Sequence, residues 1–217
     1  MTLDPEILIP EIVVIAVMLL ISFPVHEAAH AYAAYRLGDS TARLFGRMTL
    51  DPFVHFDPIG GSLMAISVLL GGGIGWAKPT PVNPANLRGR YGDAIVSAAG
   101  PLSNLGLAIL GGVIFRGVAL TRADVSFLYQ VLYLFVEINL GLMIFNLLPI
   151  PPLDGSKVLY SVLDYRTAMR VRPFLDQYGI LLLLFVIVFP VVQGQTILGA
   201  VYNDFLFPLT NLLVGLG

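Results

Sequence analysis

The chain has 217 residues, of which 57% are hydrophobic and only 12% are charged, and its formal net charge is −2. A soluble domain of this length needs more polar surface, so the composition predicts an integral membrane protein. The low charge and the absence of a basic cluster argue against nucleic acid as a partner. Because the chain contains no cysteine, disulfides and thiolate chemistry are excluded.

Four segments have the length and apolarity of membrane-spanning helices, which need about 20 residues each. The first has acidic residues near its start and lacks the basic leader of a signal peptide, so we expect it to be retained. A C-terminal tail, Thr196 to Gly217, is apolar but interrupted by polar residues, and either lies in the interface or dips in and returns. The predicted spans run from about Ile7 to Leu37, Asp93 to Phe115, Val125 to Leu148 and Tyr178 to Gln193.

For a further apolar stretch, Pro58 to Asn83, counting the basic residues on each side of the membrane predicts whether it spans. If it spans the membrane, the twelve basic residues split five to seven between the two sides. If it enters and leaves on one face, ten of them share a side and only Arg116 and Arg122 oppose them. The positive-inside rule favours the second arrangement, with the N-terminus outside and the basic loops in the cytoplasm. The glycine-rich stretch is therefore predicted to be a re-entrant hairpin.

The predicted fold is an all-α polytopic membrane protein. It has about four transmembrane helices, a re-entrant β-hairpin-like segment and an apolar C-terminal tail. We expect a single membrane-embedded domain over residues 1–217, with a core at about 7–165 and the last span and tail at 178–217.

The first span contains the sequence HEAAH at residues 26–30. On a helix, His26 and His30 lie one turn apart on the same face and can share one Zn²⁺ at about 2.0–2.1 Å. Glu27 lies about 100° round the helix, placed to take a proton from an attacking water. If Arg36 marks the membrane surface, the helix rise puts His30 about 9 Å and His26 about 15 Å below it. Ionisable groups at such depth are typically functional, so the pattern predicts a zinc hydrolase site inside the bilayer.

Two histidines leave one protein ligand to find, and without cysteine it must be a carboxylate or His55. Glu137 lies mid-membrane in the third span and could reach the metal by depth alone. Asp154 follows the proline-rich stretch NLLPIPPLDG, which breaks the helix where the third span meets the cytoplasmic side. In the re-entrant topology the first and third spans end on the same side, so Asp154 can meet His30. The residues by themselves leave these alternatives open.

Three motifs together resemble the site-2 protease family of intramembrane zinc metalloproteases. They are HEAAH in the first apolar helix, AGPLSN in a later one and NLLPIPPLDG at the cytoplasmic end of another. The resemblance covers residues 20 to 165. The family pattern N-x-x-P-x-x-x-x-D-G is met by Asn146, Pro149, Asp154 and Gly155.

This resemblance implies a zinc metalloendopeptidase that holds one Zn²⁺ per chain through His26, His30 and Asp154, with Glu27 as the catalytic base. Asp154 then ranks above Glu137 as the third ligand. The implied substrate is a transmembrane-helix protein, cut within or near its span in the lipid bilayer. Longer relatives carry a PDZ domain, for which this chain has no room, so it is similar to the compact prokaryotic branch. We therefore expect a multi-pass protein of a prokaryotic plasma membrane, with its active site toward the cytoplasm.

An extended substrate in lipid needs partners for its backbone N–H and C=O groups. The re-entrant stretch around Ile74 to Val82 could supply an edge strand that pairs with it. Asn104 and Asn146 could bind substrate backbone or the oxyanion, as the resemblance suggests, or could hydrogen-bond between helices. The residues predicted to contact substrate are Asn104, Asn146, Ile74, Gly75, Trp76 and Lys78.

Two other functions stay open. A membrane HExxH protease of the type that trims prenylated tails would use Glu137 as its third ligand. A zinc-transporting protein would need ligands in series across the bilayer, and the outer halves of the spans offer few. The sequence does not indicate the substrate's identity, the trigger or the oligomeric state.

Overall fold

The computed structural model describes residues 9, 12, 13, 15–69, 75–121, 125–192 and 194–216. Within them, five helices are long and apolar enough to cross a membrane, which confirms an all-α polytopic membrane protein. The described strands form one small antiparallel pair, β1 (Pro190–Val192) with β2 (Gln195–Thr196). The five helices are Ile15–Arg36, Gly92–Leu120, Ser126–Asn146, Tyr165–Val188 and Ile197–Val214.

The first membrane helix joins a π-helical turn, Met18–Ser22, to α2, Phe23–Arg36. Pro24 lies in the first turn of α2 and has no N–H to donate to the preceding turn, and the helix is widened just before it. After α2, Gly38 adopts a φ of 109°, which favours glycine. Two short helices follow, α3 (Thr41–Leu44) and α4 (Pro52–His55).

The predicted re-entrant segment begins as a helix, α5 (Pro58–Leu69), capped by the Asp57 carboxylate. From Gly75 to Asn83 the chain returns without regular structure, and we call these residues the return segment. The Lys78 N–H donates to the His55 carbonyl at 2.8 Å. The chain after α5 therefore comes back beside the point from which it entered α5. The prediction of a β-hairpin-like segment was wrong for its first half, which is the helix α5. A helix satisfies its own backbone groups in lipid, whereas an isolated strand does not.

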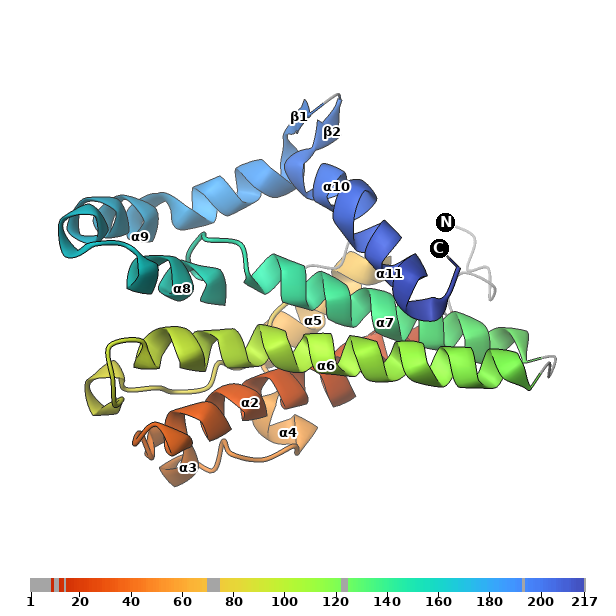
Figure 1. Ribbon diagram of the computed structural model, residues 1–217, viewed down its shortest axis with the longest axis horizontal. Helices are drawn as coiled ribbons and strands as arrows, with labels where there is room; N and C mark the ends of the chain where they lie inside the picture. Colours follow the sequence, from red (N-terminus) through yellow and green to blue (C-terminus); the bar gives the residue numbers. More distant parts are fainter. Residues whose placement is uncertain are drawn as a thin grey trace.

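Helix α6, Gly92–Leu120, lies between α2 on one side and α7, Ser126–Asn146, on the other (Figure 1). Glycines on α6 allow both neighbours to approach closely. A Cβ at Gly100 would collide with the imidazoles of α2, and one at Gly111 with the Phe135 ring of α7. One buried core lies where α6 and α7 meet the C-terminal tail and comprises Ala108, Phe115, Val136, Leu140, Leu206 and Val214.

The fourth membrane helix, α9, begins at Tyr165 and not near Tyr178 as predicted. The Asp164 carboxylate accepts hydrogen bonds from the N–H groups of Arg166 and Thr167, which caps a helix start ahead of the apolar run. In Figure 1, α9 leads away from α2 and α6 toward the β1–β2 hairpin.

The tail forms a fifth helix that is long and apolar enough to cross a membrane, where the sequence indicated an interfacial or re-entrant tail. Helix α10 (Ile197–Val201), a π-helical turn (Tyr202–Leu206) and α11 (Phe207–Val214) follow one another without a break. The tail packs on α6 and α7, where Arg116 donates to the carbonyls of Leu212 and Leu213 in the last turn of α11. Partners inside the protein therefore satisfy the end of this helix.

Candidate metal centre and active site

The two histidines of HEAAH lie on the face of α2 that meets α6. His26 and His30 are each only 7% exposed, and their Nε2 atoms are 3.0 Å apart. The missing side chain at Gly100 leaves the space that both rings occupy. The spacing in the sequence thus places both imidazoles side by side, as predicted.

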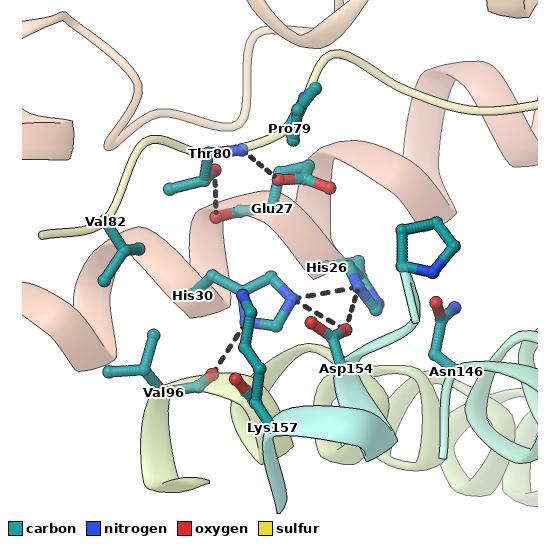
Figure 2. A pocket seen from close by; sticks show the side chains of 12 residues that line it. His26, Glu27, His30, Pro79, Thr80, Val82, Val96, Asn146, Asp154 and Lys157 are labelled. Carbon is teal, nitrogen blue, oxygen red and sulfur yellow. Dashed lines mark hydrogen bonds and ion pairs between the residues drawn. The ribbon is translucent and has the colours of Figure 1, made fainter. Parts of the chain in front are cut away.

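Asp154 reaches the same place from a distant part of the chain. A proline-rich turn follows α7 and leads to α8 (Asp154–Val162), of which Asp154 is the first residue. A Cβ at Gly155 would collide with the backbone of this turn, so glycine lets the turn close. The Oδ2 atom of Asp154 lies 3.1 Å from His30 Nε2 and 3.2 Å from His26 Nε2 (Figure 2).

These three atoms have the spacing of a tetrahedral metal site. Zn²⁺ bound at 2.0–2.1 Å holds tetrahedral ligands about 3.3 Å apart, close to the 3.0, 3.1 and 3.2 Å observed. In the part of the chain that the structure describes, His26, His30 and Asp154 are the one group of three such side chains whose ligand atoms lie within 4.8 Å of one another. A series of metal sites, as a zinc transporter needs, is not found among these residues.

The other candidates for the third ligand have different partners. The Tyr202 hydroxyl donates to Glu137 Oε1 at 2.5 Å, which ties the third membrane helix to the tail. His55 is buried, and its Nε2 lies 2.9 Å from the Thr49 carbonyl oxygen. The geometry therefore favours Asp154, in agreement with the resemblance.

Hydrogen bonds on the far side of each ring assign the tautomer that metal binding needs. His30 Nδ1 lies 2.7 Å from the Val96 carbonyl, and His26 Nδ1 lies 2.6 Å from Asn104 Oδ1. These oxygens accept, so each Nδ1 carries a proton, and a ring with no second proton offers the Nε2 lone pair to a metal. Two such lone pairs and the Asp154 carboxylate oxygen would repel one another at these distances without a cation between them. The donor set therefore fits Zn²⁺.

Glu27 faces the return segment on the other side of α2. The Thr80 N–H donates to Glu27 Oε2 at 2.7 Å, and the Thr80 hydroxyl donates to the Glu27 carbonyl at 3.0 Å (Figure 2). Glu27 and the three candidate ligands line one cavity of about 170 Å³. The other residues that line it are Pro79, Thr80, Val82, Val96, Ser97, Asn146, Pro152 and Lys157.

Of the two asparagines predicted to contact substrate, one lines the cavity and the other does not. Asn146 lines the cavity, and its amide donates to the Leu142 carbonyl at 2.9 Å. Asn104 is completely buried behind His26 and does not line it. Its hydrogen bond to the imidazole gives it a place next to the candidate metal ligands.

The return segment lines the cavity with residues that come slightly later in the chain than the four predicted to contact substrate. Pro79, Thr80 and Val82 line the cavity, whereas Gly75, Trp76 and Lys78 do not. Gly75 packs against Met64 on α5, and the Trp76 backbone passes over Gly60. Ile74 lies outside the described residues.

Two further cavity residues were missed by the sequence analysis. The Ser97 hydroxyl is buried and has no hydrogen-bond partner among the described residues. Lys157 lies one turn after Asp154 on α8 and brings a positive charge to the cavity wall. Their helical spacing from Gly100 and Asp154 was the available signal, since positions three apart on a helix share a face.

Asp39 ties the return segment to the end of α2. Its carboxylate accepts hydrogen bonds from the Thr41 N–H and hydroxyl, from the Asn83 N–H at 2.7 Å and from the Asn86 side chain at 3.0 Å. Burial raises the pKa of this carboxyl, but the four donors outweigh it and lower the pKa to about 2, from an ordinary value of 3.8. The ionised form is therefore the one that holds the return segment in place.

Replacing Asp39 by alanine is expected to cost about 1–3 kcal/mol of stability, because buried donors lose their acceptor. Since the folded-state pKa is depressed, the ionised carboxylate stabilises the fold fully above about pH 4, and this contribution disappears as the pH falls from about 4 toward 2. Thermal unfolding of the wild type and Asp39→Ala across this range provides the measurement. The difference between them should shrink at low pH; a constant difference would contradict the assignment.

The chain is similar in sequence to a known protein family and to several of its members. A model of Peptidase family M50 matches residues 114–189, which include Asp154 but not HEAAH. The chain is 36% identical over 195 residues to YwhC of Bacillus subtilis, covering 87% of this chain and 85% of that protein. It is 31% identical over 197 residues to Rip2 of Mycobacterium tuberculosis, covering 89% and 72%. Both relatives bear the name "Putative zinc metalloprotease". No solved structure matches the chain.

The likeness to YwhC extends over most of both chains. The family match independently covers the segment that carries Asp154, one of the three residues of the candidate metal cluster. From these findings together, the chain belongs to peptidase family M50, the site-2 protease family that its motifs resemble.

Proposed function

We propose that this zinc metalloprotease hydrolyses peptide bonds within or near the transmembrane segments of other membrane proteins. The observation that carries the proposal is the cluster of His26, His30 and Asp154 within a bundle of apolar helices. His30 precedes the end of its span at Arg36 by more than one helical turn. A peptidase with its site at that depth acts on chains that share the bilayer with it.

In this proposal, His26, His30 and Asp154 hold Zn²⁺, which when bound polarises the carbonyl of the scissile bond. Glu27 takes the proton from the attacking water and delivers it to the leaving amine. The Thr80 N–H holds one oxygen of the Glu27 carboxylate, so the carboxylate keeps a single orientation during the transfer. Water reaches the site along the polar wall of the cavity.

A transmembrane helix shields its peptide bonds with its own hydrogen bonds, so cleavage requires local unwinding. The unwound stretch then needs partners for its backbone, and the return segment is the nearest extended chain at the cavity. Asn146 and Ser97 add polar side-chain groups to the cavity wall. Helix-breaking residues in the substrate lower the cost of unwinding and should therefore favour cleavage.

Cleavage-site mapping tests this function. The purified protein is incubated in liposomes with designed single-span substrates, one with Gly and Pro near one end of its span and one with Leu at those positions. Mass spectrometry should locate cuts inside the span, and mainly in the first substrate. Cuts confined to the loops outside the span would contradict intramembrane action.

The same proposal places the protein in the plasma membrane of a prokaryote with the active site toward the cytoplasm. Ten of the twelve basic residues then lie on the cytoplasmic side, as the positive-inside rule favours. This orientation also puts the ends of α2 and α7, which carry the two halves of the site, on that side.

Single-cysteine labelling in intact cells checks the orientation, and the chain has no cysteine of its own to remove. Ser40 lies at an exposed position just after α2, which carries the two histidines, and Tyr165 lies at an exposed position just after α8, which carries Asp154. Ser40→Cys and Tyr165→Cys should resist a membrane-impermeant reagent, whereas Leu120→Cys, 85% exposed at the opposite end of α6, should react. Reaction of Ser40→Cys and Tyr165→Cys on opposite faces would contradict the arrangement.

A further inference from the structure

Behind His26 lies a line of three hydrogen bonds that ends on the backbone of α7. His26 Nδ1 donates to Asn104 Oδ1 at 2.6 Å, and Asn104 Nδ2 donates to Asn139 Oδ1 at 3.0 Å. Asn139 Nδ2 in turn donates to the Phe135 carbonyl at 2.9 Å. Both asparagines are completely buried, so water does not compete for these bonds. The line crosses from α2 through α6 to α7.

The backbone carbonyl at its end sets the direction of the whole line, because a carbonyl can only accept. Asn139 must turn its nitrogen toward Phe135 and its oxygen toward Asn104. Asn104 must then offer its nitrogen to Asn139 and its oxygen to His26. A reversed Asn104 would set two oxygens against each other and would offer His26 a donor, which moves the ring proton to Nε2. A protonated Nε2 cannot bind a metal.

The two histidines differ in this respect. His30 Nδ1 is held directly by the Val96 carbonyl, a group that cannot be reversed. His26 is held by a side-chain amide, which presents either an acceptor or a donor according to how it is turned. The tautomer of His26 therefore depends on the residue that keeps the Asn104 amide from reversing, and Asn139 is the other hydrogen-bond partner of Asn104 in this line.

We infer that Asn139 is a positioning residue for the metal centre. Acting through Asn104, it keeps the His26 proton on Nδ1 and leaves Nε2 free for the metal. The inference rests on the proposed zinc site and adds to it a residue on α7, more than one turn from the NLLPIPPLDG motif.

The test is the zinc affinity of the purified full-length chain, measured by titrating Zn²⁺ against a chromophoric chelator in the absence of substrate. Asn139→Leu keeps the branched arrangement of side-chain heavy atoms, although leucine is larger, and removes the acceptor for Asn104. We expect the dissociation constant for zinc to rise about tenfold, as outer-shell changes at metal sites do. Asn211→Leu is the matched control, since Asn211 accepts an interhelical hydrogen bond from the Tyr133 hydroxyl in another part of the bundle. It should leave the zinc affinity unchanged.

A second substitution separates orientation from packing. Asn104→Asp places an oxygen at both ends of the side chain, so His26 meets an acceptor whichever way the group is turned. In the Asn104→Asp background, Asn139→Leu should therefore no longer lower the zinc affinity, whereas a purely packing role for Asn139 predicts the same loss in both backgrounds. If thermal unfolding of the zinc-free protein shows that Asn139→Leu fails to fold, Asn139→Ala carries the same comparison.

Wild-type zinc affinity in the Asn139 variants would overturn the inference and leave the zinc site standing. A loss of affinity that Asn104→Asp does not reverse would also overturn it, since packing would then explain the effect. Failure of the wild-type chain to bind zinc would overturn the proposed function, and with it the inference that depends on that site.

Discussion

Replacing Glu27 by glutamine is expected to lower peptide cleavage by about 10²–10⁴-fold, the range for removal of a general base, while zinc stays bound. Glutamine has nearly the same shape and can still accept the Thr80 N–H, so the return segment keeps its contact. It cannot take up a proton at neutral pH, so the attacking water loses its base. The measurement pairs cleavage rates on a single-span substrate with the zinc content of the purified variant.

Glu137→Gln is the matched control for this change. Glu137 is the other glutamate within the described membrane helices, and glutamine can still accept the Tyr202 hydroxyl. We expect Glu137→Gln to cleave at nearly the wild-type rate. Full activity in Glu27→Gln would remove Glu27 from the mechanism, whatever its position beside the histidines.

The second large effect is expected from Asp154. Asp154→Ala removes the one carboxylate oxygen that lies within 3.2 Å of both imidazoles. The loss of a direct ligand should weaken zinc binding by more than the roughly 10–100-fold of outer-shell changes, and cleavage should disappear with the metal. Zinc titration of the substrate-free protein separates the loss of metal from the loss of substrate binding.

The same titration decides between the two carboxylates left open by the motifs. Glu137→Gln should bind zinc as the wild type does, because its hydrogen bond to Tyr202 keeps that side chain at the tail. Retention of zinc by Asp154→Ala together with its loss from Glu137→Gln would support the prenyl-tail type of protease instead. In that outcome, Asp154 would line the cavity without binding the metal.

The helical spacing of HEAAH was enough to predict that two imidazoles share one face of a membrane helix. This relation is local, since residues four apart on a helix always lie one turn apart. The charge count likewise predicted that the segment from Pro58 to Asn83 returns to its starting face, and the bond between Lys78 and His55 agrees with it. Boundaries were less certain: the early start of α9 depended on the cap at Asp164.

What the sequence determined by itself was therefore the class of protein, the two histidines and the family motifs, all of which follow from composition or local spacing. Only the tertiary structure decided that Asp154 and not Glu137 meets the histidines, and that Thr80 holds Glu27. It also turned Asn104 from a predicted substrate contact into a partner of His26. These contacts join residues 53 to 128 positions apart, and no local propensity specifies them; they depend on how closely the glycines of α6 let the helices pack.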